Sequence, residues 1–283
     1  MTASFHCGAF TFSLARPLVM GVLNVTPDSF SDGGRYSDPT RALAHARQMR
    51  ADGADLIDIG GESTRPGALP VPEGDELARV IPLVEMLAAE GFAIAVDTRK
   101  PAVMRAAIAA GAAMINDVGA LTAAGAVEAC ADSDAGICLM HMQREPPTMQ
   151  AAPVYRDVVA EVREFLVARA RACEAAGIAT QRIVIDPGFG FGKTLAHNLA
   201  LLRSIGTLAA TGYPVLAGLS RKSSLGEITG RSVDERLPAS LAAALAAVAR
   251  GAAIVRVHDV RETVDAIKIW CAVERGGDTE NGG

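Results

Sequence analysis

The sequence has few of the features that mark membrane, secreted or nucleic-acid-binding proteins. Its most apolar stretch, 237–249, is flanked by two arginines and is too short for a membrane span of roughly 20 residues. The N-terminus, MTASFHCGAF, has no basic segment followed by an apolar core, so we expect no export signal. The formal net charge is -5, whereas a general nucleic-acid binder usually has a basic face. We expect a cytoplasmic protein that binds neither membranes nor nucleic acids.

Two further absences limit the kinds of bonds, metal sites and catalytic groups that we expect. The five cysteines are odd in number, scattered and without a CxxC pair, which indicates reduced, mostly buried thiols rather than disulfides or a zinc site. The chain also has no GxSxG motif, and no cysteine stands beside a histidine in a recurring polar cluster. An activated nucleophile is therefore not expected.

The chain does contain a repeated alternation of short apolar runs and helical stretches. Hydrophobic residues make up 50% of its 283 positions, and the apolar runs are continuous, as in strands covered on both faces. We expect strands near 18–24, 54–60, 92–97, 113–117, 135–140, 182–186, 213–218 and 252–257. We expect helices near 39–52, 75–90, 101–110, 122–132, 155–176, 195–206, 234–250 and 260–274.

This order of elements predicts the α/β class and, within it, a (β/α)8 TIM barrel. Alternation near 5–14 predicts a short N-terminal strand or hairpin before the barrel. No shift in composition divides the chain, so we expect one domain over 1–275 and a disordered tail over 276–283. Two long loops, 25–38 and 61–74, are rich in Gly, Pro and Ser and are expected to act as flaps over a site.

Polar or glycine-rich clusters follow nearly every predicted strand. In a barrel these strand ends share one edge, where the active site lies. The segment GFGFGKT is such a cluster, but a phosphate-binding loop needs glycine five positions before Gly192, where Pro187 stands. What remains is Asp186 at a strand end, followed by a turn that we expect to present Phe189 and Phe191.

Five of these clusters together resemble the dihydropteroate synthase family, the folate-pathway enzymes inhibited by sulfonamides. They are NVTPDSFSDGG, GGESTRPG, DPGFGFGKT, SRKS and RVHDV, in that order. The similarity runs from about residue 17 to 270. It implies a pterin-binding TIM barrel that joins 6-hydroxymethyl-7,8-dihydropterin pyrophosphate to p-aminobenzoate and releases pyrophosphate. One departure is visible, because Arg144 and Glu145 follow HMQ where the family usually has glycine.

The resemblance assigns a set of side chains to the pterin ring. Asp186 matches the carboxylate that would accept two parallel bonds from the amide and amino edge of the ring. Asn116 and Asp97 match the partners of the other ring nitrogens, Lys222 would donate to ring acceptors, and Met140 would pack against the ring. The ordinary alternatives are that Asn116 bonds loop backbone, Asp97 caps a helix and Met140 belongs to the core.

The pyrophosphate needs fixed positive charge as it leaves. Arg256 and His258 follow the last strand, where barrels often bind phosphate, and arginine can pair with two phosphate oxygens. A surface ion pair and a helix cap are their ordinary alternatives. Asn24 matches the family residue that contacts Mg²⁺, an ion that takes few protein ligands when substrate phosphates supply the rest.

The second substrate needs an aromatic slot and a group that binds its carboxylate. Ser223, with its backbone N–H near a helix start, suits the carboxylate, and Arg221 would stack on the pterin face unless it is a solvated surface charge. The remaining residues that the resemblance assigns to substrate binding are Thr64, Arg65, Pro66, Phe191, Lys222 and Gly218.

The resemblance also predicts the mechanism. The electron-rich dihydropterin would help to expel pyrophosphate, and the aromatic amine would attack the resulting cation without a strong enzymic base. The predicted catalytic residues are Asp97, Lys222, Arg256 and His258, with small-molecule substrates and a homodimer as partners. The Ala-rich helices near 237–250 and 260–274 are candidates for the dimer contact. The alternatives are a barrel of the methyltetrahydrofolate methyltransferase type and a non-catalytic pterin-binding homologue.

Overall fold

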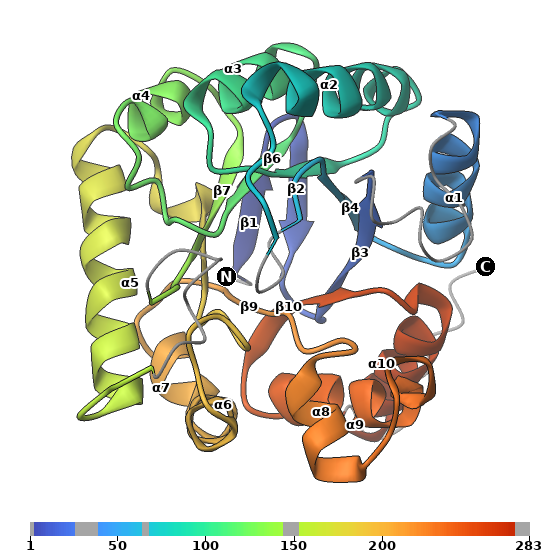
Figure 1. The fold of residues 1–283 in the computed structure, drawn as a ribbon, viewed down its shortest axis with the longest axis vertical. Coiled ribbons are helices and arrows are strands. Elements are labelled where there is room, and N and C mark those ends of the chain that lie inside the picture. The colour runs from blue at the N-terminus through green and yellow to red at the C-terminus, as the bar shows by residue number, and fades with distance from the viewer. Residues whose placement is uncertain (1–2, 26–38, 64–67, 144–152, 275–283) are drawn as a thin grey trace.

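Eight parallel strands close into a barrel in the order β10-β3-β4-β5-β6-β7-β8-β9 (Figure 1). The computed structural model describes residues 3–25, 39–63, 68–143 and 153–274. The predicted (β/α)8 barrel is confirmed, with each strand within two residues of its expected limits. The strands are β3 (Leu18–Asn24), β4 (Leu56–Gly60), β5 (Ile94–Asp97), β6 (Met114–Asp117), β7 (Gly136–Met140), β8 (Ile183–Asp186), β9 (Val215–Ala217) and β10 (Ala252–Val257).

Helices surround the barrel, and most of them lie where the sequence predicts. They are α1 (Pro39–Ala51), α2 (Glu73–Ala89), α3 (Pro101–Ala109), α4 (Ala126–Ala131), α5 (Val158–Ala175), α6 (Leu195–Arg203), α7 (Ile205–Ala209), α8 (Ser223–Thr229), α9 (Leu237–Val248) and α10 (Val260–Glu274), with 3₁₀ turns η2 (Thr180–Arg182) and η3 (Val233–Glu235).

Four helical segments differ from the prediction. The helix expected over 122–132 is the shorter α4, which begins four residues later. The helix expected over 195–206 ends at 203, and α7 starts two residues later, on the other side of Ser204. The helix expected over 234–250 begins as the separate turn η3. The helix α8 is absent from the expected set because its seven residues, with Gly226 among them, are too few to show an apolar period.

The strands bury both faces, and alternate residues divide between two cores. Leu18, Met20 and Ile254 belong to the core inside the barrel, whereas their neighbours Val19 and Val255 pack outward beneath the helices. This period of two determines which side chains point into the barrel, and it continues to the ends of the strands.

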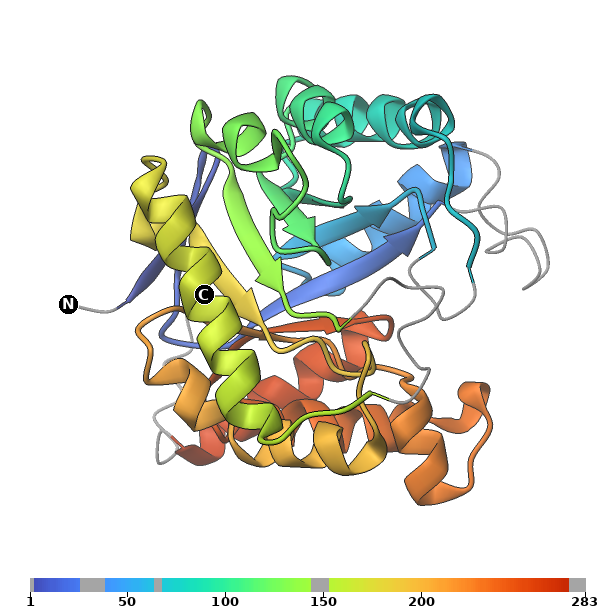
Figure 2. The same ribbon diagram turned by 60° about the vertical axis from the view of Figure 1, so that its left-hand side comes forward.

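An N-terminal hairpin closes the barrel at the end opposite the carboxyl ends of the strands (Figure 2). The strands β1 (Ser4–Cys7) and β2 (Phe10–Ser13) pair antiparallel, as predicted for residues 5–14. Phe5 and Cys7 are fully buried in the inner core. A Cβ added to Gly136 would come within 2.7 Å of both of them. The hairpin therefore plugs the barrel.

Several sequence predictions lie outside the described residues. They include the tail 276–283, Arg144 and Glu145, most of the first flap and the centre of the second, 64–67. Among the residues that the structure describes, no helix has both the length and the apolar character needed to cross a membrane.

Candidate active site

On most strands of the barrel, the inward face changes from apolar to polar at the carboxyl end, whereas β7 ends in Met140. On β10, buried Ile254 is followed by Arg256, and on β8, buried Val184 is followed by Asp186. The paired registers place Asp97 beside Asn116. We define the carboxyl edge of the barrel as the rim. Its side chains form a polar layer with one apolar member, Met140. The rim contains Asn24, Asp58, Asp97, Asn116, Met140, Asp186 and Arg256.

Arg256 is the centre of the polar network at the rim. Its Nε donates to Asp58 Oδ2 over 2.5 Å, and its Nη2 donates to Asp97 Oδ2 over 3.0 Å. Asn116 Nδ2 donates to the same oxygen of Asp58 over 3.1 Å. Four strands therefore contribute to one bonded cluster, although the residues are up to 198 positions apart. The predicted convergence of Asp97, Asn116 and Arg256 is present.

Two carboxyl groups of the rim hold protons more tightly than they would in water. Burial raises the pKa of Asp97 to about 7, with Arg256 opposing the increase and Asp58 adding to it. Burial also raises the pKa of Asp186 to about 6, although the N–H of Gly188 and the charge of Lys222 oppose it. Asp97 shares the Arg256 guanidinium with Asp58, so burial and repulsion between these two carboxylates outweigh the attraction of Arg256 for Asp97. At neutral pH, Asp186 is mostly ionised and can accept hydrogen bonds.

Lys222 lies opposite these carboxyl groups. Burial, together with the charge of Arg256, lowers the pKa of Lys222 to about 8. Its Nζ is 4.3 Å from the centre of the Phe191 ring, a cation–π contact. A Cβ on Gly190 would lie 3.3 Å from Lys222 Cδ, so the lysine stem packs against the glycine turn. This brings Lys222 and Phe191 together, as predicted.

The glycine turn between β8 and α6 is held by backbone contacts. Gly188 has φ +68°, and a Cβ there would lie 1.9 Å from the carbonyl oxygen of His141, so glycine is required. The buried Lys193 donates to His141 Nδ1 over 3.0 Å and to the Phe191 carbonyl over 2.9 Å. The turn presents Phe191, but Phe189 is 1% exposed and packs in the outer core. The prediction that the turn presents Phe189 is therefore wrong.

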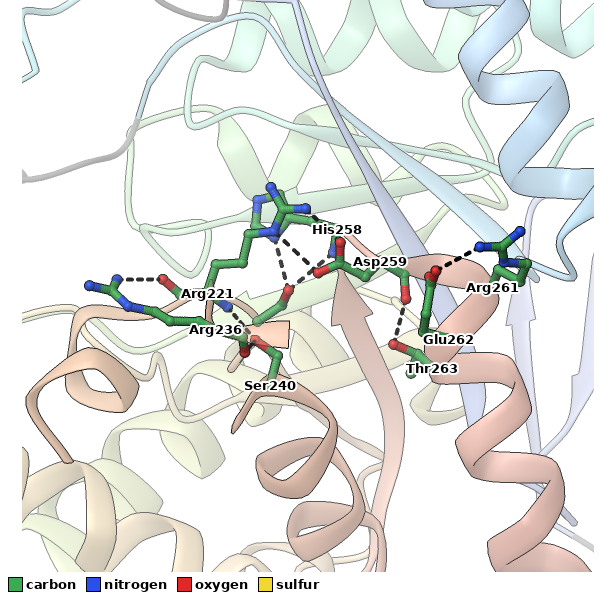
Figure 3. Close-up of polar contacts among 9 residues, drawn as sticks. Arg221, Arg236, Ser240, His258, Asp259, Arg261, Glu262 and Thr263 are labelled. Atoms are coloured by element: carbon green, nitrogen blue, oxygen red, sulfur yellow. Dashed lines mark hydrogen bonds and ion pairs between the residues drawn. The ribbon is translucent and has the colours of Figure 1, made fainter. Parts of the chain in front are cut away.

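The segment after β9 and the end of β10 form a second network (Figure 3). His258 Nδ1 lies 3.0 Å from Ser220 Oγ. Arg221, at φ +57°, donates through Nη2 to Asp259 Oδ1 over 2.5 Å, and Arg236 donates to the Arg221 carbonyl over 3.2 Å. Arg221 is therefore bound at the outer edge of the rim, and the prediction that it stacks on a pterin remains a prediction.

A cavity of about 360 Å³ adjoins the glycine turn. Ser223, the exposed first residue of α8, lines it. Gly218 lies at the rim, where its added Cβ would be 3.9 Å from Arg256 Cβ. Met140 is buried at the end of β7, paired in register with Asp186.

The second flap is described only at its two flanks, so Thr64, Arg65 and Pro66 lie outside the described residues. Lys100 connects these flanks. Its Nζ donates to the Glu62 carboxylate, to the Val71 carbonyl over 2.8 Å and to Glu76 over 2.5 Å. Both ends of the flap are thereby fixed to the start of α3.

Asn24 ends β3 at the rim, where its Oδ1 would lie 3.5 Å from a Cβ on Gly60. An amide oxygen is a hard donor of the type that Mg²⁺ takes, and Mg²⁺ bound to phosphates needs few protein ligands. In the described part of the chain, no group of three His, Cys, Asp or Glu side chains is placed to hold a metal ion. The role of Asn24 in binding Mg²⁺ remains a prediction.

Sequence reasoning missed two residues of this region. Asp58 lies inside the apolar run LIDIG, and Lys193 was treated only as part of the glycine-rich motif. A charged residue in a strand covered on both faces was a usable signal for Asp58, because unpaired charges are costly to bury.

The fold and site together define a TIM-barrel protein with a polar ligand site at the carboxyl edge of its strands. Residues 20–258 match the sequence profile of the family described as "Pterin binding enzyme". The chain is 55% identical to the dihydropteroate synthase of Neisseria meningitidis serogroup B over 95% of its length and 97% of the relative. It is 49% identical to that of Escherichia coli K12, over 92% of each chain.

The chain is also similar to solved structures of dihydropteroate synthases. A Burkholderia cenocepacia dihydropteroate synthase complexed with 7,8-dihydropteroate has a TM-score of 0.89 and 53% identity, over 97% of this chain and 98% of that one. A Xanthomonas albilineans dihydropteroate synthase with 4-aminobenzoic acid has a TM-score of 0.91 and 53% identity, over 97% and 99%. A Yersinia pestis one with a sulfonamide drug complex has a TM-score of 0.93 and 47% identity, over 96% and 99%. The chain therefore belongs to the pterin-binding enzyme family and, within it, to the dihydropteroate synthases.

Proposed function

We propose that this chain condenses 6-hydroxymethyl-7,8-dihydropterin pyrophosphate with p-aminobenzoate, giving 7,8-dihydropteroate and pyrophosphate. The family supports this reaction, and relatives with 53% and 52% identity have been solved in complex with 7,8-dihydropteroate. The observation that carries the proposal is the single bonded cluster of Asp58, Asp97, Asn116 and Arg256 on one rim, with Asp186 and Lys222 beside it.

The pterin ring would bind in the polar layer at the mouth of the barrel. Asp186 would accept two bonds from the amide and amino edge of the ring, for which its ionised form is suited. Asn116 and Asp97 would bond the other ring nitrogens, and Lys222 would donate to ring acceptors. Met140, 5% exposed beside Asp186, would supply an apolar wall.

Transfer would depend on charge stabilisation and positioning rather than on a nucleophile. Arg256 and His258 would bind the pyrophosphate as the bond to the pterin methylene breaks, with its electron pair leaving on oxygen. The carboxylate of Asp97 would stabilise the cationic pterin. The amine nitrogen would then form the new bond and release its proton, which becomes acidic once the bond exists.

Asn24 would hold Mg²⁺ at the rim through its amide oxygen. The bound ion would neutralise charge on the departing pyrophosphate. We expect Asn24→Ala to raise the Mg²⁺ concentration needed for half-maximal turnover, with pterin-ring binding unchanged. Equal Mg²⁺ dependence in the variant and the wild type would remove Asn24 from this role.

The p-aminobenzoate would bind next to the glycine turn. Phe191 and the Lys222 stem would form walls of its slot, and the Ser223 hydroxyl and N–H would bind its carboxylate. The cavity that Ser223 lines also borders Gly190 of the glycine turn, which supports this assignment. Thr64, Arg65 and Pro66 would complete the slot, and the two flaps would exclude water.

A single assay tests the proposal. The purified chain is incubated with both substrates, with and without Mg²⁺, and dihydropteroate is measured by chromatography. We expect product only with both substrates, and faster with Mg²⁺. Absence of product from the intact protein would reject the function, and methyl transfer to a corrinoid would support the methyltransferase alternative instead.

We also infer a homodimer. The helices α9 and α10 lie side by side (Figure 1), and α10 exposes Ile269 and Val273, which are one turn apart and 69% and 73% exposed. Sedimentation velocity should show a dimer that Ile269→Asp weakens. A monomer at micromolar concentration in the wild type would contradict this. The cytoplasmic location remains a prediction.

A further inference from the structure

Asp58 is a buried carboxylate that no step of the proposed reaction uses. It lies on β4 between Leu56 of the inner core and Gly60 of the rim, and it is 0% exposed. Its Oδ2 accepts from both Arg256 and Asn116. Among the described residues, its buried Oδ1 has no hydrogen-bond partner. A residue that served stability alone would be a poor choice here, because an unsatisfied buried oxygen costs free energy.

Hydrogen bonds that Arg256 donates to Asp58 and Asp97 fix the orientation of its guanidinium. Its Nε is bonded to Asp58 and its Nη2 to Asp97. With two of its nitrogens held by carboxylates on different strands, the planar group has one orientation. The direction in which its remaining N–H groups point is therefore also set.

The bond from Asn116 to Asp58 decides which end of the amide faces the ligand. An ionised carboxylate only accepts hydrogen bonds, so Asn116 must direct its NH2 group toward Asp58. Its carbonyl oxygen is then left to accept from a ring N–H. Without an acceptor-only partner, the amide could turn over and present a donor instead.

We propose that Asp58 is a positioning residue that orients Arg256 and Asn116 together for the pterin substrate. This rests on the proposed function. Asp58 acts through these two side chains rather than by touching the reacting atoms. Because Arg256 and Asn116 donate to the same oxygen of Asp58, the orientation of each side chain depends on that of the other.

The first test is Asp58→Asn, which keeps the shape but adds a donor. We expect kcat/KM for the pterin pyrophosphate, per folded molecule, to fall by 10- to 100-fold and the pterin dissociation constant to rise by at least tenfold. A change of less than threefold in both quantities would overturn the proposal.

A double-mutant cycle separates positioning from a structural role. In an Arg256→Gln background, Asp58→Asn should lower kcat/KM by a clearly smaller factor than in the wild type, because the guanidinium is gone and only the orientation of Asn116 is left to lose. A purely structural role would lower kcat/KM by the same factor in both backgrounds. That outcome would overturn the proposal.

A matched control exists immediately before the first residue of the same strand. Asp55 also pairs with an arginine, because Arg16 Nη2 lies 2.6 Å from its Oδ1, but it lies away from the rim. Asp55→Asn should leave kcat/KM within twofold. If Asp55→Asn lowered kcat/KM as much as Asp58→Asn does, removal of either Asp–Arg pair near β4 would lower activity. That result would overturn the proposal.

If Asp58→Asn does not fold, Asp58→Glu keeps the charge and moves the carboxylate by one methylene. We expect this variant to lose at least tenfold in kcat/KM, and near-normal activity would count against positioning. The wild-type assay keeps the two hypotheses apart. An inactive wild type rejects the proposed function, whereas an active wild type with an active Asp58→Asn rejects only the role of Asp58.

Discussion

At the scale of single residues, burial determines the pKa values and the binding strength of the charged groups at the rim. Asp186 is 5% exposed, and the charges of Lys222, Lys193 and Arg256 act on it. In a buried site, a carboxylate binds a matching pair of donors strongly. Much of the affinity for a pterin should therefore depend on this one group.

We expect Asp186→Ala to weaken pterin binding by about 2–4 kcal/mol, because charge-assisted hydrogen bonds are lost in a buried site. Isothermal titration with the pterin pyrophosphate measures this. Asp265→Ala on α10, with a 69% exposed carboxylate, is the control and should bind like the wild type. Unchanged affinity in Asp186→Ala would show that another group reads the ring edge.

Asp97 should make stability depend on pH. Its pKa in the folded protein, about 7, is above the ordinary value of 3.8, so the folded state binds the proton more tightly. The resulting stabilisation is complete below pH 4 and is lost as the pH rises to 7. One pKa unit corresponds to about 1.4 kcal/mol, which gives an upper limit of about 4 kcal/mol.

Urea unfolding of the wild type and Asp97→Asn from pH 4 to 8 measures this effect. The free energy of unfolding of the wild type should decline relative to the variant between pH 4 and 7, and then run parallel to it. A relative increase with pH would mean that Arg256 dominates and that the pKa of Asp97 is lowered instead.

At the scale of elements, periodicity accounts for most of what the sequence could predict. Eight apolar runs and their helix stops placed the barrel strands within two residues. The inward position of Asp97, Asn116 and Asp186 then followed from the shared rim. The short helix α8 and the division at Ser204 escaped prediction because neither alters an apolar period.

Contacts made by the backbone were the other feature that the sequence could not reveal. The orientations of Phe189 and Phe191 depend on the three glycines of the turn, Gly188, Gly190 and Gly192, which all have positive φ.

The ion pair between the side chains of Asp58 and Arg256 could not be predicted either, because it joins residues 198 positions apart. Only the closed barrel shows that they meet.

The glycine turn should be intolerant of side chains at one position in particular. Gly188→Ala places a Cβ 1.9 Å from a backbone carbonyl, whereas Gly177→Ala at φ +93° meets nothing within 4 Å. Gly177→Ala should cost about 1–2 kcal/mol from the left-handed backbone. Gly188→Ala should cost at least about 2 kcal/mol more, because the clash adds overpacking. Urea unfolding gives both values, and equal losses would contradict the clash.

At the scale of the whole molecule, the two ends of the barrel have different tasks. The carboxyl edge holds the polar layer, whereas the amino edge is sealed by Phe5 and Cys7 of the hairpin, both 0% exposed. Residues at the closed end of such barrels contribute to stability, and residues at the open end contribute to chemistry. Stability and activity should therefore be separable by mutation.

The prediction for Phe5→Ala follows from this division. Removing a fully buried ring should lower the free energy of unfolding by about 3–5 kcal/mol. Phe10→Ala, a half-buried ring on the same hairpin, should cost distinctly less. In both variants kcat/KM per folded molecule should stay within twofold of the wild type, since the plug lies at the opposite end of the strands from Arg256. A large loss of activity without loss of stability would show instead that the inner core transmits changes from the plug to the rim.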